Sequence, residues 1–358
     1  MTTVINQKTD LKTSAPDDFL EYALNHQFGE IHCKVDAETG MKAIIAIHNT
    51  KLGPALGGCR FIEYPDTNTA LFDAMRLARG MSYKSAIARL PLGGGKSVII
   101  KPRQTFNREA YFHRFGEFVN ELNGQYITAL DSGTQLDDMD IIAQHTPYVA
   151  SLSRHDGDPS FSTARGVLRG IEAAVSHKLN KDSLKGLHIA IQGLGHVGAL
   201  LARYVTELGA RITVADVDSI RTESIAKEYG ATVVSVHDIH KVPCDVFAPC
   251  ALGAIINDTT IREFQTTIIA GAANNQLAHT YHGQVIHDKG ILYAPDYVIN
   301  AGGVIFACGK YFHTSDQDVV KHIDEIRSSL LQIFDRSTKE NKPTSDIADN
   351  IAAEILSG

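Results

Sequence analysis

Two lysines stand in sequence settings where their charges could take part in chemistry, and the first of them is Lys84. It belongs to a helical pattern over residues 68–88 and falls on a stripe at helical spacing. The stripe comprises Ala70, Ala74, Leu77, Met81, Lys84 and Ala88. Because the stripe is otherwise apolar, an unpaired cation on it would cost free energy if it were buried. We therefore interpret Lys84 as a partner for a substrate carboxylate. The alternative is a lysine near a helix end whose ammonium group reaches solvent.

The second lysine, Lys96, follows the three glycines 93–95 and precedes an apolar strand over residues 97–100. Three glycines remove side chains from around the ammonium group and let a ligand approach it. Burial and a second lysine nearby both lower the pKa of a lysine. An amine with a pKa near ~7–8 serves as an acid and a base at neutral pH, so Lys96 is a candidate for proton transfer.

A third candidate residue is Asp131, which directly follows a predicted strand over residues 125–130 and precedes Ser132 and Gly133. In α/β proteins the carboxyl ends of strands commonly carry the chemistry, which makes Asp131 a candidate for a part in it. The alternative is an aspartate that only shapes a turn, and on this feature alone we favour it.

The strongest local motif runs from Leu187 to Val205, where an apolar strand leads through Gly193-x-Gly195-x-x-Gly198 into a helix. The three glycines predict a tight turn, close approach of the backbone to a pyrophosphate, and close packing of helix on strand. His196 and Val197 lie within this turn, and Asp216 ends the next strand about 20 residues on. A carboxylate there would accept the ribose 2′-hydroxyl and repel a 2′-phosphate, which favours NAD over NADP. The alternative is a structural turn.

The remaining pattern supplies the elements that position these residues and predicts two α/β domains. The predicted strands are 42–48, 97–100 and 125–130 in the first part, and 187–191, 211–215, 232–235, 246–248 and 267–270 in the second. Strands that alternate with helices in the second part indicate a doubly wound parallel sheet. We predict a flexible extension over 1–17, a substrate-binding and oligomerisation domain over 18–150, a dinucleotide domain over 151–335, and a C-terminal helical segment over 336–358 that packs back on the first domain.

Composition narrows the class of protein. The chain has 358 residues, of which 44% are hydrophobic and 21% charged, as in globular proteins. A net charge of -7 argues against nucleic acid as a partner, and no apolar run is long enough for a membrane span. The five scattered cysteines form no Cys-x-x-Cys pair, which predicts reduced thiols, a cytoplasmic location and no zinc site.

Nine segments of the chain resemble the leucine, phenylalanine and valine dehydrogenases of the glutamate dehydrogenase superfamily, above all the leucine dehydrogenases. They are GPALGGCR (53–60), MSYKSA (81–86), LGGGKSVI (92–99), YITALDSGT (126–134), DMDII (138–142), QGLGHVG (192–198), CDVFAPCALG (244–253), GAANNQL (271–277) and APDYVINAGGV (294–304). The similarity extends in one register over about residues 25–350. It implies an N-terminal α/β substrate domain, a Rossmann-type dinucleotide domain and a deep cleft between them.

The resemblance also implies roles for individual residues. Lys84 would hold the substrate α-carboxylate, Lys96 would activate water, and Asp131 would move a proton to and from the substrate nitrogen. Asn274 and Asn275 would contact the nicotinamide ribose and the substrate, and Thr163 would approach the nicotinamide amide. Two departures from the family pattern are Leu130, at a position that is often acidic, and Arg165, where tyrosine or valine is more usual.

The implied reaction is the reversible, NAD-dependent oxidative deamination of an apolar L-amino acid to a 2-oxo acid and ammonium, without a metal, by a homo-oligomer that is a dimer or an octamer. Leu56 matches a lysine that grips the side-chain carboxylate in glutamate dehydrogenases, and with Val304 it favours leucine, valine and isoleucine. Ala307 stands where leucine dehydrogenases carry a bulkier valine and leaves aromatic substrates, phenylalanine or tryptophan, as the alternative. Two other hypotheses are a non-catalytic NAD-binding sensor and a 2-hydroxy acid dehydrogenase, although the histidines form no pattern typical of the latter.

Overall fold

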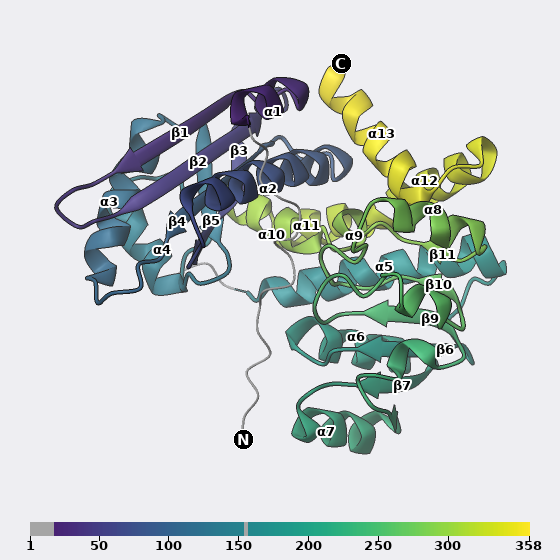
Figure 1. Ribbon diagram of the computed structural model, residues 1–358. Coiled ribbons are helices and arrows are strands. Elements are labelled where there is room, and N and C mark those ends of the chain that lie inside the picture. The colour runs from purple at the N-terminus through teal and green to yellow at the C-terminus, as the bar shows by residue number, and fades with distance from the viewer. Residues whose placement is uncertain (1–17, 154–156) are drawn as a thin grey trace. The chain divides into compact units, whose positions relative to one another are not determined.

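The computed structural model describes residues 18–153 and 157–358 and shows two compact α/β units (Figure 1). One unit contains the described residues up to 153 together with Ile355–Gly358, and the other contains Gly157–Glu354. The extension predicted for residues 1–17 lies outside the described residues. In the described part of the chain, no helix is long and apolar enough to cross a membrane.

The first unit is built on a five-stranded sheet of order β1-β2-β4-β3-β5. The strands are β1 (Glu30–Val35), β2 (Lys42–Asn49), β3 (Ala55–Ile62), β4 (Gly93–Ile100) and β5 (Tyr126–Leu130). β3 runs parallel to both β4 and β5, whereas β2 runs antiparallel to β1 and β4. β4 is therefore the central strand, paired along both of its edges.

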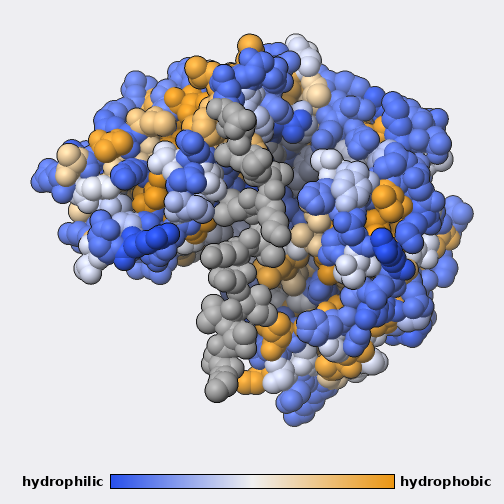
Figure 2. Space-filling model, viewed as in Figure 1, coloured by the Kyte–Doolittle hydropathy of each residue, from blue (hydrophilic) through white to orange (hydrophobic). Residues whose placement is uncertain are grey.

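Helices cover both faces of this sheet. They are α1 (Phe19–Asn25), α2 (Thr67–Ile87), α3 (Arg108–Glu121) and α4 (Leu136–Ala143). Successive side chains of β2 alternate between the faces: Ile44 belongs to the cluster under α2, and Ile45 belongs to the cluster with Phe112 and Phe115 of α3. Full burial of such side chains contributes about 1.5–3 kcal/mol each. On the outside, Figure 2 shows hydrophobic residues around α1 and β1, where Leu20, Leu24 and Val35 are exposed.

The face by which α2 packs on the sheet differs from the predicted stripe. The buried positions include Ala70, Ala74, Ala78, Ser82 and Ser85, whereas Leu77, Met81, Lys84 and Ala88 are only half-buried. The prediction is therefore wrong beyond Ala74. The reason is the close approach of α2 to β4: a Cβ at Gly94 would lie 2.0 Å from the backbone nitrogen of Ser82. At position 82, that spacing selects a small side chain.

The second unit contains a six-stranded sheet of order β11-β10-β9-β6-β7-β8 in which every pairing is parallel. The strands are β6 (His188–Gln192), β7 (Arg211–Ala215), β8 (Thr232–Val233), β9 (Cys244–Pro249), β10 (Thr266–Ile269) and β11 (Leu292–Tyr293). The helices are α5 (Pro159–Leu179), α6 (His196–Glu207), α7 (Ser219–Tyr229), α8 (Tyr281–Asp288), α9 (Asp296–Ile299), α10 (Gly302–Tyr311), α11 (Asp316–Asp324) and α12 (Ile326–Glu340), and α13 (Thr344–Ser357) ends the chain. The prediction of a doubly wound parallel sheet is confirmed.

Candidate active site

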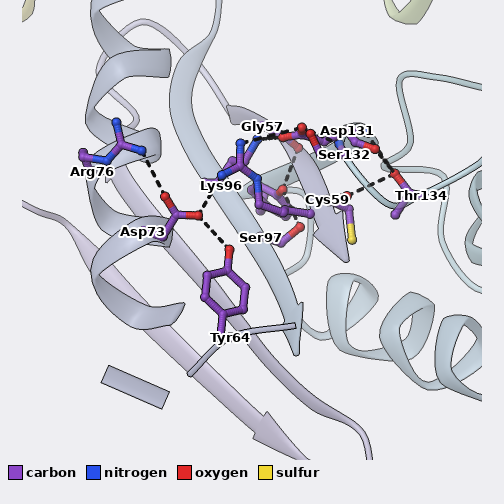
Figure 3. Close-up of polar contacts among 12 residues, drawn as sticks. Gly57, Cys59, Tyr64, Asp73, Arg76, Lys96, Ser97, Asp131, Ser132 and Thr134 are labelled. Carbon is purple, nitrogen blue, oxygen red and sulfur yellow. Dashed lines mark hydrogen bonds and ion pairs between the residues drawn. The ribbon is translucent and has the colours of Figure 1, made fainter. Parts of the chain in front are cut away.

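Lys96 and Asp131 come together in the first unit. Lys96 lies on the central strand β4 with only 6% of its surface exposed, and Asp131 directly follows β5. The Lys96 ammonium forms an ion pair with Oδ2 of Asp131 (Figure 3). β3 separates the two strands, so the contact crosses over β3 at Gly58. A Cβ at residue 58 would lie 2.7 Å from Cβ of Asp131, and only glycine leaves room for this pair.

The turn after β5 holds Asp131 through its backbone and its side chain. The backbone N–H of Asp131 donates to Oγ1 of Thr134 at 3.0 Å, and the Thr134 hydroxyl donates to the Asp131 carbonyl at 2.7 Å. The backbone N–H of Ser132 donates to Oδ1 of Asp131 at 2.5 Å. One carboxylate oxygen is thus held by the turn, and the other faces the ammonium group.

Burial lowers the pKa of Lys96 to about 7. The charge of Arg60 on β3 and, more weakly, that of Lys84 on α2 act in the same direction, whereas Asp73 and Cys59 raise the pKa. A lysine with a pKa in this range exchanges a proton readily at neutral pH.

Two charged residues beside this pair were not predicted from the sequence as site residues. Arg60 donates from Nη1 to Oδ2 of Asp73 at 2.8 Å, and its Nη2 lies 4.0 Å from Oδ1 of Asp131. Asp73 is 3% exposed and also accepts hydrogen bonds from Tyr64 at 2.7 Å and Arg76 at 3.1 Å (Figure 3). In the sequence, Arg60 is noticeable only as the last residue of the segment GPALGGCR. The family resemblance of that segment does not predict that Arg60 contacts Asp73 or lies beside Asp131.

The other predicted residues of the first unit are Lys84 and Leu56. Lys84 is half-buried in the last turn of α2, near enough to Lys96 to affect its pKa. Leu56 is 2% exposed on β3, in register with Gly94 of β4 and Ile127 of β5. Leu130, which precedes Asp131, is 41% exposed, so its departure from the family pattern leaves a surface position apolar.

In the second unit, the turn from β6 to α6 fits a dinucleotide pyrophosphate. Gly195 is the N-cap of α6 and offers no side chain to cap the first N–H groups. A Cβ built at Gly195 meets nothing within 4 Å, whereas one at Gly198 would lie 2.0 Å from the carbonyl oxygen of Gly193. The helix start is therefore open on one side and packed against the turn on the other, as an anion site requires. Of the other two residues in the turn, His196 is exposed and Val197 half-buried.

Asp216 directly follows β7 and reaches the same turn. The backbone N–H of Leu194 donates to its Oδ2 at 2.5 Å, and the N–H of Asp218 donates to its Oδ1 at 2.9 Å. The carboxylate is thus fixed beside the glycine-rich turn, where a ribose attached to the pyrophosphate would lie.

The remaining predicted residues lie elsewhere in the second unit. Asn274 and Asn275 are both exposed; Oδ1 of Asn274 accepts from Asn300 at 2.7 Å, and Asn275 has a φ of 51°. Thr163 of α5 contacts the start of α10, since a Cβ at Gly303 would lie 2.9 Å from its Oγ1. Val304 and Ala307 of α10 are half-buried. The sequence-predicted residues therefore form one group around Lys96 in the first unit and separate groups in the second.

The structure gives a physical account of Arg165. Its guanidinium binds Asp324 with two hydrogen bonds of 2.7 Å, from Nε to Oδ1 and from Nη2 to Oδ2. Arg169 donates to the same carboxylate at 2.8 Å, so α5 and α11 are joined by a charged network. Arg165 therefore has a structural role within the second unit.

Comparison with known proteins agrees with this arrangement. Residues 26–148 match the model of the Glu/Leu/Phe/Val dehydrogenase dimerisation domain, and residues 158–223 and 216–354 match the Glutamate/Leucine/Phenylalanine/Valine dehydrogenase model. The chain is 46% identical over 342 residues to leucine dehydrogenase from Geobacillus stearothermophilus, covering 95% of this chain and 93% of that protein. It is 43% identical over 324 residues to phenylalanine dehydrogenase from Thermoactinomyces intermedius, covering 89% and 88%.

Among solved structures, L-tryptophan dehydrogenase from Nostoc punctiforme matches with a TM-score of 0.87 and 40% identity, over 94% of this chain and 98% of that one. The glycine-rich turn and Asp216 in the second unit fit the NAD that these dehydrogenases use. The chain therefore belongs to the Glu/Leu/Phe/Val dehydrogenase family of NAD-dependent amino-acid dehydrogenases.

Proposed function

We propose that this chain catalyses the reversible oxidative deamination of an aliphatic L-amino acid, with leucine, valine and isoleucine as its substrates. The reaction consumes the amino acid, NAD⁺ and water, and yields the 2-oxo acid, ammonium, NADH and a proton. The observation that carries this proposal is the ion pair between Lys96, which is buried on the central strand β4, and the half-buried Asp131, which follows the edge strand β5. The NAD⁺ supplies a hydride acceptor when bound.

The side chains of the first unit have distinct tasks in this proposal. Lys84 binds the substrate α-carboxylate and fixes the orientation of Cα. Asp131 takes up a proton from the substrate nitrogen and returns one when ammonia leaves. Lys96, in its neutral form, accepts a proton from the water that attacks the imine carbon. Its pKa of about 7 suits this step, because the neutral amine is then abundant at and above neutral pH.

In the second unit, the first N–H groups of α6 hold the pyrophosphate, and Asp216 accepts from the ribose 2′-hydroxyl. Thr163 and Asn274 bind the nicotinamide end, and Asn275 contacts the substrate. These roles follow the family pattern and the open turn at Gly195.

The proposal also specifies which amino-acid side chain the substrate carries. Leu56 is buried and apolar, which favours an aliphatic chain. An aromatic substrate is the second candidate, because Ala307 is small and because proteins named phenylalanine and tryptophan dehydrogenases are nearly as similar as those named for leucine. Initial rates of NADH formation with leucine, valine, isoleucine, phenylalanine and tryptophan separate the two; no turnover with any of them would refute the proposal.

Self-association forms part of the proposal, as a dimer or an octamer. It is supported by the match of residues 26–148 to a dimerisation domain and by the exposed apolar side chains around α1 and β1. Light scattering on the intact chain measures the state directly.

Cofactor choice is expected to depend on Asp216. Replacing it with serine removes the charge that repels a 2′-phosphate, so the ratio of kcat/KM for NAD⁺ to that for NADP⁺ should fall at least ~10-fold. Serine also loses one of the two oxygens that hold the Leu194 and Asp218 backbone, so KM for NAD⁺ should rise as well. Asp218→Ser is a neighbouring control. An unchanged ratio in Asp216→Ser would remove Asp216 from ribose binding.

The deamination rate is expected to rise with pH through a midpoint near 7. Burial holds the pKa of Lys96 at about 7, below that of an ordinary lysine, so the proton blocks water activation below this pH and is lost above it. The measurement is kcat at saturating leucine and NAD⁺ between pH 5.5 and 10. A flat profile across this range would contradict a lysine base.

A further inference from the structure

Alternating charges run through the first unit from the surface of α2 to Lys96. Arg76, 36% exposed, pairs with Asp73 at 3.1 Å; Asp73 pairs with Arg60 at 2.8 Å; Arg60 lies 4.0 Å from Asp131; and Asp131 contacts Lys96. The row joins α2, β3, the turn after β5 and β4, so it forms only when the sheet and α2 are assembled. Four members of this row, Arg76, Asp73, Asp131 and Lys96, are labelled in Figure 3.

The buried member of the row, Asp73, is an anion at neutral pH. Burial raises its pKa, but Arg60, Tyr64 and Arg76 outweigh that effect and hold the pKa below its usual range. With Asp73 charged, Nη1 of Arg60 has a fixed acceptor, and the orientation of the guanidinium is set.

Arg60 is poorly placed for a purely structural role. Its Nε is buried and has no hydrogen-bond partner in the described part of the chain, and its Nη2 stops 4.0 Å short of Asp131. An arginine used only as a connector would be expected to satisfy these donors. What this placement does provide is a permanent positive charge beside the ion pair of Lys96 and Asp131.

We propose that Arg60 is a positioning residue for the reaction: Asp73 holds its guanidinium beside Asp131, and its charge favours the neutral amine of Lys96. This inference rests on the proposed function, in which Lys96 must be neutral to accept a proton from water. The groups that face Lys96 are Asp131 from the turn after β5, Arg60 and Cys59 from β3, and Asp73 and Lys84 from α2.

Arg60 and Asp73 act on Lys96 with opposite signs, which gives a sharp test. Arg60 lowers the pKa of Lys96, and Asp73 raises it. In Arg60→Met the midpoint of the kcat–pH profile should move to higher pH, by roughly one unit. In Asp73→Asn, the amide oxygen can still accept the hydrogen bond from Arg60 while the negative charge is lost, so the midpoint should move to lower pH. Loss of a merely structural ion pair would not move the two variants in opposite directions.

Two further variants complete the experiment. Arg60→Lys retains the charge and should return the midpoint towards the wild-type value. Arg114→Met breaks a comparable network with Asp36 and Glu117, outside this row, and should leave the midpoint unchanged. Circular dichroism checks the fold of each variant. If Arg60→Met does not fold, the inference is tested by Asp73→Asn alone, in which the midpoint of the kcat–pH profile should move to lower pH.

The outcomes separate this inference from the function on which it rests. Opposite shifts in Arg60→Met and Asp73→Asn support it. Shifts in the same direction, or unmoved midpoints in folded and active variants, overturn it and leave the proposed deamination intact. A wild-type chain that forms no NADH with any amino acid overturns both.

Discussion

Asp131→Asn is expected to lower kcat for leucine deamination at least ~10²-fold, a loss of about 2.7 kcal/mol of transition-state stabilisation. Asparagine has nearly the same shape and can still accept the hydrogen bond from Ser132, so the turn after β5 should keep its form. The variant loses only the charge and the ability to take up a proton. Removing a group that acts on the reacting proton lowers kcat, whereas removing a group that binds raises KM.

Lys96→Ala should have an effect of the same size, because it removes the other half of the pair, and the double variant should be little worse than either single one. Lys84→Ala should differ in kind: it removes an anchor for the α-carboxylate and should chiefly raise KM for the amino acid. The measurement is steady-state kinetics with thermal denaturation and NADH binding as checks of folding. Asp137→Asn, an exposed carboxylate at the start of α4, is the matched control. A near-normal kcat in folded Asp131→Asn would exclude this residue from proton transfer.

The second large effect concerns substrate choice: kcat/KM for leucine is expected to exceed that for glutamate by at least ~10³. Leu56 is 2% exposed and offers no positive charge. A glutamate side chain beside it would place an unpaired carboxylate against apolar surface, at a cost of several kcal/mol. An aliphatic chain instead gains roughly 0.8 kcal/mol for each buried methylene.

A charge at residue 56 should reverse part of this preference. Leu56→Lys is expected to raise activity with glutamate and to lower it with leucine, whereas Leu56→Met, which stays apolar, should retain the leucine preference. The measurement is kcat/KM for leucine, phenylalanine, tryptophan and glutamate with each variant. Glutamate as the best substrate of the wild-type chain would disprove the role of Leu56, and a preference for an aromatic substrate would favour Ala307 as the determinant.

The fold was predictable where the hydrophobic pattern is strong. The five strands predicted in the second unit are present, because buried parallel strands are short apolar runs between helices. Three strands were not predicted. β3 contains Gly57 and Gly58, which lower its β-propensity although the close approach across β3 requires them. β1 has no fully buried residue, so its hydrophobic pattern is weak. β11 has only two residues, which is too short for a pattern.

The site was predictable only where its residues carry a local sequence signal. Lys96 and Asp131 stand next to glycines and at a strand end, which are local signals, although their roles came from the family resemblance. The ion pair of Arg60 and Asp73 joins a strand to a helix, and neither residue differs locally from a solvated surface charge. The packing of α2 was misjudged for the same reason: Ser82 faces the sheet because Gly94 lies against it, a contact that helical spacing does not encode.

The central position of β4 has a consequence for the way this protein opens. Backbone amides exchange their hydrogens with solvent when the pairing of the strands opens, and this opening begins at the edges of a sheet. β4 is protected from it, because β2 pairs with it on one side and β3 on the other. The backbone amide of Lys96 should therefore be among the slowest in the first unit to exchange its hydrogen for deuterium, and those of β1 among the fastest. Fluctuations that loosen β1 would leave the proposed base Lys96 in place, whereas fluctuations of the opposite edge, β5, would move Asp131 away from it.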